Sequence, residues 1–267
     1  MNKMGIKMIV CDLDGTLLDD DKNVSLFTQQ TIKQFHDNGY LFTIASGRYK
    51  DLILMMLEKW GLKEITDYIA YGNGFGYYNL KTQEDKTFYR IDPSIVDKVT
   101  EEFKDYNVGL IYHRGNYVIS NNNNPELIRL AERDNIGYVI KDNEYFKNLE
   151  TSKYIIGGEI SEIDKIEKIA KKYPNVKSFR GTPYQYEYVD IRDSKANSLI
   201  DLFDKINISK EEVIVFGDMI NDVDMLELVP NSVAMINGDE FAKKAAHDIT
   251  EFDNNNDGVA KYLLKKL

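Results

Sequence analysis

Two carboxylates at the end of an apolar run are the clearest chemical signal in the sequence. Asp12 and Asp14 lie in "IVCDLDGT", directly after the apolar residues 9–11. Residues two apart in an extended chain point to the same side, so both acids can converge on one point. Gly15 then permits a sharp turn out of the strand. An isolated pair of this kind is also common as a solvated strand end, so it needs support from other residues.

The chemistry that suits this acid pair is phosphoryl transfer beside a metal ion. Two acids this close need a cation near them, and Mg²⁺ prefers oxygen ligands. Asp12 would attack phosphorus as the nucleophile, and Asp14 would act first as an acid and then as a base. An aspartyl-phosphate intermediate divides one slow hydrolysis into two easier steps.

Two further segments carry groups that bind phosphate. Ser46 and Gly47, in "TIASGRY", stand between a predicted strand and a helix that begins near Tyr49. A hydroxyl and free backbone N–H groups at a helix start bind phosphate, although a serine that caps the helix is commoner. Lys195, in "IRDSKANSL", opens another predicted helix. This lysine could neutralise phosphate and the charge of the nucleophile, or it could be an ordinary surface lysine.

A fourth segment follows a strongly apolar run near the C-terminus. In "VIVFGDMINDVDMLE", Asp218, Asn221 and Asp222 come after a predicted buried strand and a glycine. An acid, an amide and a second acid can hold Mg²⁺ through direct contacts and supporting hydrogen bonds.

The elements that must position these groups form an α/β pattern. Short apolar runs typical of strands buried on both faces alternate with helical patterns, as in a doubly wound α/β fold. The predicted strands are residues 7–11, 41–45, 68–71, 212–216 and 232–236, and the predicted helices are Ser25–Asn38, Asp51–Trp60 and Lys195–Ile206. Each candidate cluster falls at the carboxyl end of a predicted strand or at the start of a helix. Ligands of open α/β sheets bind at that edge.

The middle of the chain has a different pattern. From Gln83 to Asp190 the predicted strands are joined by hairpin-like turns, at Arg114-Gly115-Asn116 and Gly181-Thr182-Pro183. Two helices are predicted among them, Pro125–Asn135 and Glu162–Tyr173. We therefore expect residues 83–190 to form an α+β insertion with an antiparallel sheet, inside an α/β domain made of residues 1–82 and 191–267.

Composition narrows the class of protein. The chain has 267 residues, 43% of them hydrophobic and 29% charged, which is enough to build a proper core. A net charge of −10 argues against nucleic acid and anionic membranes as general partners. The single cysteine suits a reducing compartment. No apolar run approaches the length of a signal peptide or membrane span, so we expect a cytoplasmic protein.

Taken in chain order, these motifs resemble the haloacid dehalogenase superfamily of phosphohydrolases. The matching segments are D-x-D-G-T at Asp12–Thr16, the strand-end Ser46, Lys195, and G-D-x-x-N-D at Gly217–Asp222. "ASGR" at 45–48, "YGNGF" at 71–75 and "NSVAMINGDEFAKKAAHDIT" with "DGVAKYL" are similar to the Cof-type phosphatases, which carry a large α/β cap of the C2 type. The resemblance covers nearly the whole chain, and the cap region matches by architecture and position more than by motif.

The resemblance implies a Rossmann-like, three-layer core with a parallel sheet, interrupted by the α+β cap. It also implies Mg²⁺ as cofactor and small phosphorylated metabolites, typically sugar phosphates, as substrates. In this family Asp12 would be the nucleophile and Asp14 the acid and base. The other implied roles are phosphate binding by Ser46, Gly47, Lys195 and Asn221, Mg²⁺ ligation by Asp12, Asp218 and the backbone carbonyl of Asp14, and support of the metal site by Asp222.

Two alternatives share the same residues. A phosphomutase would return the phosphoryl group to its substrate, and a non-catalytic protein would only bind a phosphorylated metabolite. The sequence also departs from the family at Met219 and Ile220, where Gly or another small or polar residue is usual, and at Ala196, where a Gly commonly follows the lysine. These departures concern loop geometry and choice of substrate, because no charged group of the site is lost.

Overall fold

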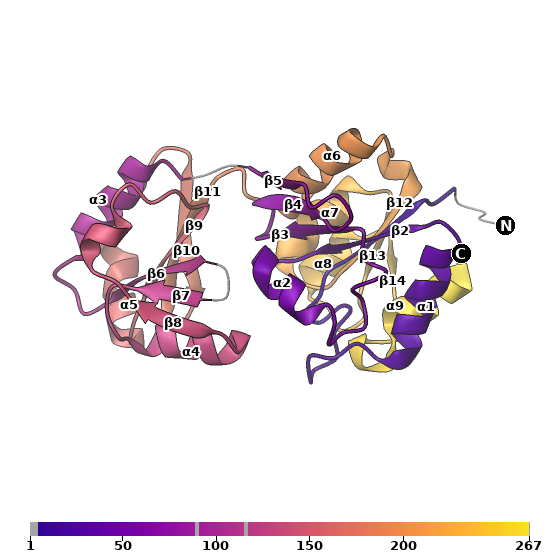
Figure 1. Ribbon diagram of the computed structural model, residues 1–267, viewed down its shortest axis with the longest axis horizontal. Coiled ribbons are helices and arrows are strands. Elements are labelled where there is room, and N and C mark those ends of the chain that lie inside the picture. The colour runs from indigo at the N-terminus through magenta and orange to yellow at the C-terminus, as the bar shows by residue number, and fades with distance from the viewer. Residues whose placement is uncertain (1–4, 89–90, 115–116, 267) are drawn as a thin grey trace. The chain divides into compact units, whose positions relative to one another are not determined.

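The chain divides into two compact units in the computed structural model, and one unit is inserted into the other (Figure 1). The structure describes residues 5–88, 91–114 and 117–266. We call Met1–Phe88 together with Ser194–Leu267 the core unit, and Tyr89–Asp193 the inserted unit. The sequence places the start of the insertion at Gln83, but residues 85–87 form a strand that pairs within the core unit.

A sheet of eight described strands forms the centre of the core unit, in the order β14-β13-β12-β1-β2-β3-β4-β5. The strands from β14 to β3 run parallel, and β4 and β5 extend the sheet antiparallel. Their bounds are β1 Met8–Cys11, β2 Leu41–Ala45, β3 Tyr68–Tyr71, β4 Gly76–Asn79, β5 Asp85–Thr87, β12 Val213–Gly217, β13 Asn231–Ala234 and β14 Asp248–Ile249. The central strands β1 and β12 are buried along their whole length, as expected for a parallel sheet covered on both faces.

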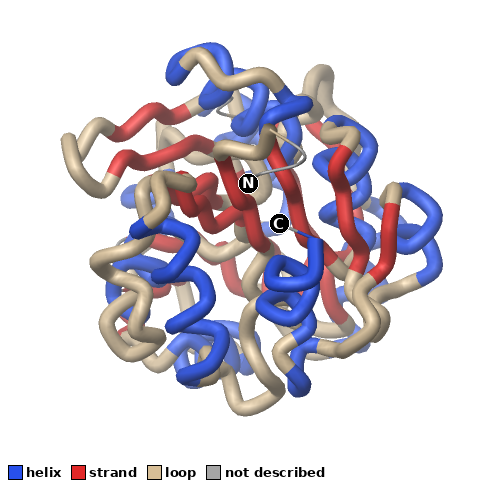
Figure 2. Tube along the Cα trace, turned by 90° about the vertical axis from the view of Figure 1, so that its right-hand side faces the viewer, coloured by secondary structure: helices blue, strands red, loops and turns tan. Residues whose placement is uncertain are grey.

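Helices cover both faces of this sheet, which makes three layers. Helices α1, α2 and α9 pack on the face that carries Ile9 and Cys11, and α6, α7 and α8 pack on the opposite face. Figure 2 shows strands of the core unit lying between helices. The helix bounds are α1 Leu26–Asp37, α2 Lys50–Met56, α6 Lys195–Ile206, α7 Val223–Leu228, α8 Glu240–Ala245 and α9 Gly258–Lys266. The predicted α/β class and three-layer core are confirmed.

Local sequence explains where these helices begin and end. Ser25 caps α1 by accepting a 3.0 Å hydrogen bond from the N–H of Thr28. Helix α2 ends at Met56, four residues before the predicted end at Trp60. The chain turns there because Trp60 is fully buried and its indole N–H donates to the carbonyl of Lys22, 3.1 Å away.

The inserted unit contains a sheet of six described strands, in the order β10-β11-β9-β6-β7-β8. Neighbouring strands are antiparallel except β7 and β8, which are parallel and joined through α4. Helices α3 and α5 pack on one face, and α4 packs on the other. The bounds are α3 Pro93–Phe103, β6 Gly109–Arg114, β7 Tyr117–Ser120, α4 Pro125–Asp134, β8 Gly137–Ile140, β9 Lys153–Gly157, α5 Ile160–Ile169, β10 Val176–Thr182 and β11 Gln185–Asp190.

Two predictions for the inserted unit need correction. Helix α5 spans Ile160–Ile169 instead of Glu162–Tyr173, because Tyr173 leaves the helix to donate a 2.9 Å hydrogen bond to Glu102. The second hairpin turns at Pro183, since β10 continues to Thr182 through an irregularity in its pairing. In the first hairpin, Arg114 pairs with Tyr117, and the predicted turn residues Gly115 and Asn116 lie outside the described residues.

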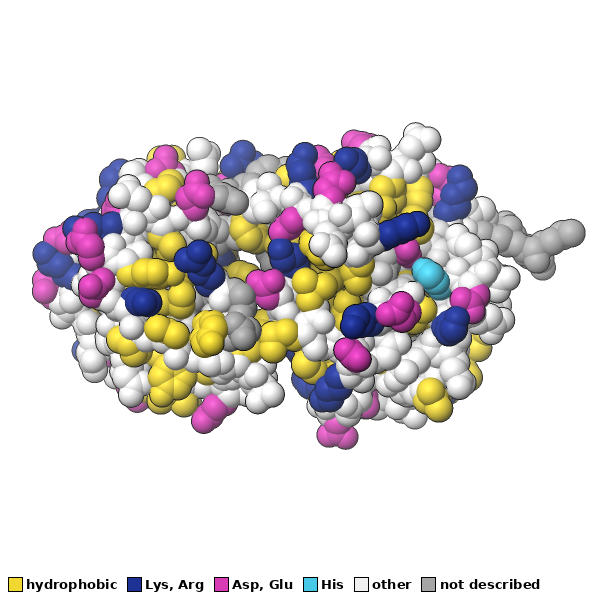
Figure 3. Space-filling model, in the orientation of Figure 1, with side chains coloured by type: hydrophobic (Ala, Val, Ile, Leu, Met, Phe, Trp, Pro, Cys, Tyr) yellow, Lys and Arg dark blue, Asp and Glu magenta, His cyan; other side chains and the backbone are white. Residues whose placement is uncertain are grey.

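Charged side chains of both signs lie on the surface. On the face drawn in Figure 3, acidic and basic side chains are interspersed over both units. Among the described residues, no helix combines the length and apolar character needed to cross a membrane.

The inserted unit also buries a titratable group, His113, and this predicts a pH-dependent stability. Burial lowers the pKa of His113 from 6.5 to about 3. The folded protein therefore keeps His113 neutral while the unfolded chain takes up a proton below pH 6.5, so stability is lost as the pH falls from 6.5 toward 3. We expect unfolding by urea at pH 5 to show about 2 kcal/mol of stability lost through this group. His113→Asn should lack this part of the loss, and equal pH dependence in both proteins would contradict the assignment.

Candidate active site

The predicted site residues come from segments that meet at the carboxyl-end edge of the core sheet. Strand β1 lies between β2 and β12, so the loops that follow these three strands are neighbours. The loop residues are Asp12 and Asp14 after β1, Ser46 and Gly47 after β2, and Asp218, Asn221 and Asp222 after β12. Helix α6 brings its first residue, Lys195, to the same place. The parallel topology thus brings together side chains that are more than 200 positions apart.

Lys195 is buried between two carboxylates. Its Nζ lies 2.6 Å from Asp12 Oδ1 and 2.6 Å from Asp222 Oδ1, and the residue is 1% exposed. Burial alone would lower the pKa of Lys195, but the two carboxylates outweigh it and raise that pKa well above its usual value. Lys195 is therefore not an ordinary surface lysine. Asp12 is buried as well, so it is not a solvated strand end.

Asp222 holds the loop after β12 in shape. One of its oxygens binds Lys195, and the other accepts hydrogen bonds from the backbone N–H groups of Asp218, at 2.9 Å, and Met219, at 3.0 Å. Both oxygens of Asp222 are therefore engaged. The side chain connects Lys195 to the backbone that carries Asp218.

Asp218 faces the loop after β1. Its Oδ1 accepts a 2.9 Å hydrogen bond from the Thr16 hydroxyl. A Cβ atom on Gly15, whose φ is +84°, would lie 2.3 Å from the other oxygen, Oδ2. Only glycine therefore lets the loop come this close to the carboxylate. Burial raises the pKa of Asp218 to about 6, against the lowering effect of the Thr16 hydrogen bond.

The acidic cluster fits a small divalent cation. One oxygen from each of Asp12, Asp218 and Asp222 lies within 4.8 Å of the others. Burial raises the pKa of Asp12 above its usual value; Lys195 opposes this shift and Asp222 adds to it. A bound cation would favour the ionised form of these acids, and a set of hard oxygen donors suits Mg²⁺. Because both oxygens of Asp222 are engaged, Asp12 and Asp218 are the side chains left to bind it.

Asp14 has a separate environment, set by two cations. Arg48 binds it through two parallel hydrogen bonds, Nε to Oδ2 and Nη2 to Oδ1, each 2.8 Å long. Lys22 Nζ lies 3.0 Å from Oδ1. Burial works to raise the pKa of Asp14, but Arg48 and Lys22 prevail and lower it to about 2. The carboxylate is thus ionised near neutral pH, and its side chain is directed to these cations.

Ser46 and Gly47 lie close to two asparagines, Asn73 and Asn221. The Ser46 hydroxyl accepts a 3.2 Å hydrogen bond from the N–H of Arg48. Helix α2 has Tyr49 as its N-cap, so Ser46 is not its capping residue. A Cβ atom on Gly47 would lie 2.9 Å from Asn73 Oδ1, and the same oxygen accepts a 3.1 Å hydrogen bond from Asn221. Asn73 thereby links the loop after β2 to the loop after β12.

Four residues of this site received no role from sequence reasoning. They are Thr16, Lys22, Arg48 and Asn73. Thr16, Arg48 and Asn73 lie inside the motifs D-x-D-G-T, "ASGR" and "YGNGF" that resemble the family. Their place in these motifs is the signal by which the sequence could have identified them. Lys22 lies in a polar loop whose composition looks like any solvated turn.

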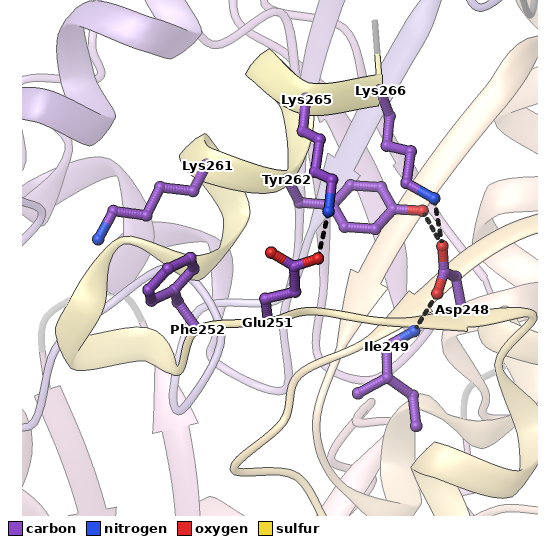
Figure 4. A pocket seen from close by; sticks show the side chains of 8 residues that line it. All are labelled: Asp248, Ile249, Glu251, Phe252, Lys261, Tyr262, Lys265 and Lys266. Atoms are coloured by element: carbon purple, nitrogen blue, oxygen red, sulfur yellow. Dashed lines mark hydrogen bonds and ion pairs between the residues drawn. The ribbon is translucent and has the colours of Figure 1, made fainter.

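A pocket at the sheet edge near the C-terminus is separate from these residues (Figure 4). It lies between α9 and β14, and its lining residues include none of the predicted site residues. Lys266 and Tyr262 both reach Asp248, at 2.8 Å each, and Lys265 binds Glu251. These contacts fasten the last helix to the last strand, and we assign the pocket no chemistry.

Comparison with known proteins places the chain in a family. The family model described as haloacid dehalogenase-like hydrolase matches residues 9–263. The chain belongs to this family, and the resemblance to its Cof-type members is confirmed. The chain is 29% identical to a Streptococcus pyogenes protein whose name describes it provisionally as a phosphatase, and the match covers 98% of each chain.

Other similar proteins also match the chain over nearly its full length. The 5-amino-6-(5-phospho-D-ribitylamino)uracil phosphatase YitU of Bacillus subtilis is 26% identical, with 96% of each chain covered. A haloacid dehalogenase-like hydrolase from Bacteroides thetaiotaomicron has a solved structure with a TM-score of 0.89 and 27% identity, covering 98% of this chain and 100% of that one. TM0651 from Thermotoga maritima also has a TM-score of 0.89, at 28% identity, with coverages of 98% and 97%.

The buried ion triad predicts a large loss of stability when its cation is removed. Lys195→Met would leave Asp12 and Asp222 as buried, uncompensated acids, so we expect unfolding by urea to show a loss of about 3–5 kcal/mol. Lys205→Met is the matched control on the same helix, because Lys205 forms an exposed, solvent-screened pair with Glu84 and should contribute little to stability. Similar losses for the two variants would contradict this description of the site.

Proposed function

We propose that the protein is a Mg²⁺-dependent phosphatase that hydrolyses small phosphorylated metabolites, sugar phosphates among them, through an aspartyl-phosphate intermediate. The observation that carries the proposal is the buried Asp12 carboxylate, held 2.6 Å from Lys195 and beside Asp218 at the sheet edge. Membership of the hydrolase family supports it. So does the Bacillus subtilis relative, which is named for a phosphorylated ribitylamino compound.

The reaction we propose has two displacements at phosphorus. In the first, an oxygen of Asp12 bonds to phosphorus, the bond from phosphorus to the leaving oxygen breaks, and Asp14 gives that oxygen a proton. In the second, a water oxygen bonds to phosphorus, the bond to Asp12 breaks, and Asp14 takes the proton of the water. Asp14 is ionised in the free protein, and a phosphoryl dianion beside it favours uptake of the first proton.

The groups around Asp12 would hold the phosphoryl oxygens. Lys195 is the buried cation nearest the nucleophile. We assign the Ser46 hydroxyl, the backbone N–H of Gly47 and the Asn221 amide as the remaining phosphate contacts, because Asn73 lies against Gly47 and accepts a hydrogen bond from Asn221. Donors fixed before the substrate arrives stabilise developing charge without further reorganisation.

The cation would be held by Asp12, Asp218 and the backbone carbonyl of Asp14. The side chain of Asp14 is directed to Arg48 and Lys22, which leaves its carbonyl as the ligand. Asp222 would support the site through the Asp218 backbone. When bound, Mg²⁺ neutralises charge on the nucleophile and on the phosphoryl group.

Two further parts of the proposal concern the inserted unit and the location. We assign the inserted unit, Tyr89–Asp193, the role of a cap that selects the leaving group, because loops and caps exclude water in reactions of this type. We place the protein in the cytoplasm, since its one cysteine, Cys11, is buried and free.

The proposal predicts how activity depends on Asp12. We expect the wild-type protein to release inorganic phosphate from members of a sugar phosphate panel when Mg²⁺ is present. Asp12→Asn removes the nucleophile and should lower kcat by at least about 10³-fold. Phosphate release is measured by a colorimetric assay, with Asp201→Asn as the control because Asp201 lies on the exposed side of α6.

The same panel separates the alternatives. A phosphomutase would convert one sugar phosphate to another, depend on a bisphosphorylated sugar and release little phosphate. A binding protein would bind substrates without turnover. Activity of Asp12→Asn equal to that of the wild type would overturn the proposed mechanism.

The acidic cluster predicts stabilisation by Mg²⁺. Binding to the folded state alone should add about 2.7 kcal/mol of stability at a Mg²⁺ concentration of about 100 times Kd. Thermal unfolding should therefore show a rise in Tm for the wild type and for Asp201→Asn, and little or no rise for Asp218→Ala. An equal rise in Asp218→Ala would place the cation elsewhere.

A further inference from the structure

Arg48 and Lys22 surround the Asp14 carboxylate in a geometry that leaves it little freedom. The guanidinium of Arg48 contacts both oxygens at 2.8 Å, as a planar fork matched to a planar carboxylate. Lys22 adds a third contact to Oδ1 at 3.0 Å. An aspartate bound by one donor can still rotate about its side-chain torsions, whereas two parallel hydrogen bonds fix the plane of the carboxylate.

The two residues that carry these cations both contact one buried side chain, Trp60. The guanidinium of Arg48 lies 5.8 Å from the centre of the Trp60 ring, within the range of a cation–π contact. The indole N–H of Trp60 donates to the backbone carbonyl of Lys22 at 3.1 Å. Trp60 is fully buried, so it provides a rigid support for the two residues that contact Asp14.

The loop that carries Lys22 is closed by its own hydrogen bonds. Lys22 has a φ of +62°, a left-handed conformation that a non-glycine residue adopts at a cost of order 1 kcal/mol. The Asp19 carbonyl accepts from the N–H of Lys22 at 3.0 Å, and the Asp19 carboxylate accepts from the N–H of Asn23 at 2.8 Å. These hydrogen bonds hold the loop in the conformation in which the Lys22 ammonium group lies 3.0 Å from Asp14.

We propose that Arg48, supported by Trp60 and assisted by Lys22, is a positioning residue that aims the Asp14 carboxylate at the leaving oxygen of the substrate. The inference rests on the proposed function, in which Asp14 gives that oxygen its proton. Transfer of a proton needs donor and acceptor within hydrogen-bond distance and well aligned, so the orientation of Asp14 limits the rate of this step. Arg48 acts through Asp14 and exchanges no proton itself.

The nature of the leaving group distinguishes this role from general support of the fold. An alkoxide leaving from a sugar phosphate needs a proton, so its departure depends on Asp14. A p-nitrophenolate is stable as an anion and leaves without one. Loss of positioning should therefore slow the alkyl ester and spare the aryl ester, whereas a damaged fold or a lost phosphate contact would slow both.

The experiment compares kcat and KM of the wild type, Asp14→Asn, Arg48→Gln and Arg48→Lys on p-nitrophenyl phosphate and on an alkyl sugar phosphate that the wild type hydrolyses. We expect Arg48→Gln to lower kcat on the sugar phosphate by about tenfold or more. Its kcat on p-nitrophenyl phosphate should stay within about threefold, and its KM values should change little. Arg48→Lys should recover only part of the loss, because a single ammonium cannot replace the fork.

Two further variants keep the test independent of any one substitution. Trp60→Phe keeps an aromatic ring under Arg48 and loses the hydrogen bond to Lys22, so it should show the same selectivity in weaker form. If thermal unfolding shows that Arg48→Gln is not folded, Trp60→Phe takes its place in the test. Lys33→Met removes an exposed lysine paired with Asp37 on α1 and should leave both esters unaffected.

The outcomes separate this inference from the proposed function. If Asp14→Asn shows the leaving-group selectivity and Arg48→Gln loses activity equally on both esters, the positioning role is wrong while the proposed function stands. A higher KM with unchanged kcat in Arg48→Gln would also overturn the inference, since it would make Arg48 a substrate contact. A wild-type protein that hydrolyses neither ester, or an Asp14→Asn variant without selectivity, would overturn the proposed function and the inference together.

Discussion

The structure of the site depends on one buried ion triad, Asp12–Lys195–Asp222. Removing three charged groups from water is costly, and the cost is offset only if every partner is present and well placed. Here Lys195 binds both acids at 2.6 Å, and the second oxygen of Asp222 accepts two backbone hydrogen bonds. The triad thereby joins β1, α6 and the loop after β12 into one rigid assembly.

The triad carries more negative than positive charge, and this excess explains how a cation and a phosphoryl group can bind beside it. Lys195 offsets only part of the negative charge of Asp12 and Asp222, and Asp218 adds another carboxylate beside them. A divalent cation and a phosphoryl group can both occupy such a place, because the cation offsets the acids and the lysine attracts the phosphoryl oxygens. Asp14 does not contribute to this excess of negative charge, because Arg48 and Lys22 bind its carboxylate. The two neighbouring aspartates, Asp12 and Asp14, therefore lie in different environments and can have different roles.

The parts of the site that the sequence predicts are those that depend on short segments. Apolar runs followed by acids or small residues locate the ends of β1, β2 and β12, and the parallel topology brings these ends together. Asp12, Asp14 and Asp218 were therefore identifiable as candidates from their local patterns taken together. The burial of Lys195 was not, because a lysine at the start of a helix has the same local sequence whether it is buried or exposed.

Contacts between distant residues account for what the sequence does not predict. The support of Arg48 and Lys22 by Trp60 depends on where α2 ends, and that end is set by tertiary packing of the indole. Helix α5 likewise ends early because Tyr173 bonds to Glu102 from another helix. Periodicity within one segment carries no information about such partners, so helix ends and second contacts of charged residues are where prediction fails.

The central claim is that Asp12 forms a covalent bond to phosphorus. The most direct measurement is mass spectrometry of the protein quenched in acid during turnover of p-nitrophenyl phosphate, followed by peptide mapping. The account predicts the added mass of one phosphoryl group on the peptide that contains Asp12, and no such adduct in Asp12→Asn. Turnover by the wild type with no adduct at any quench time, or with an adduct on another residue, would contradict it.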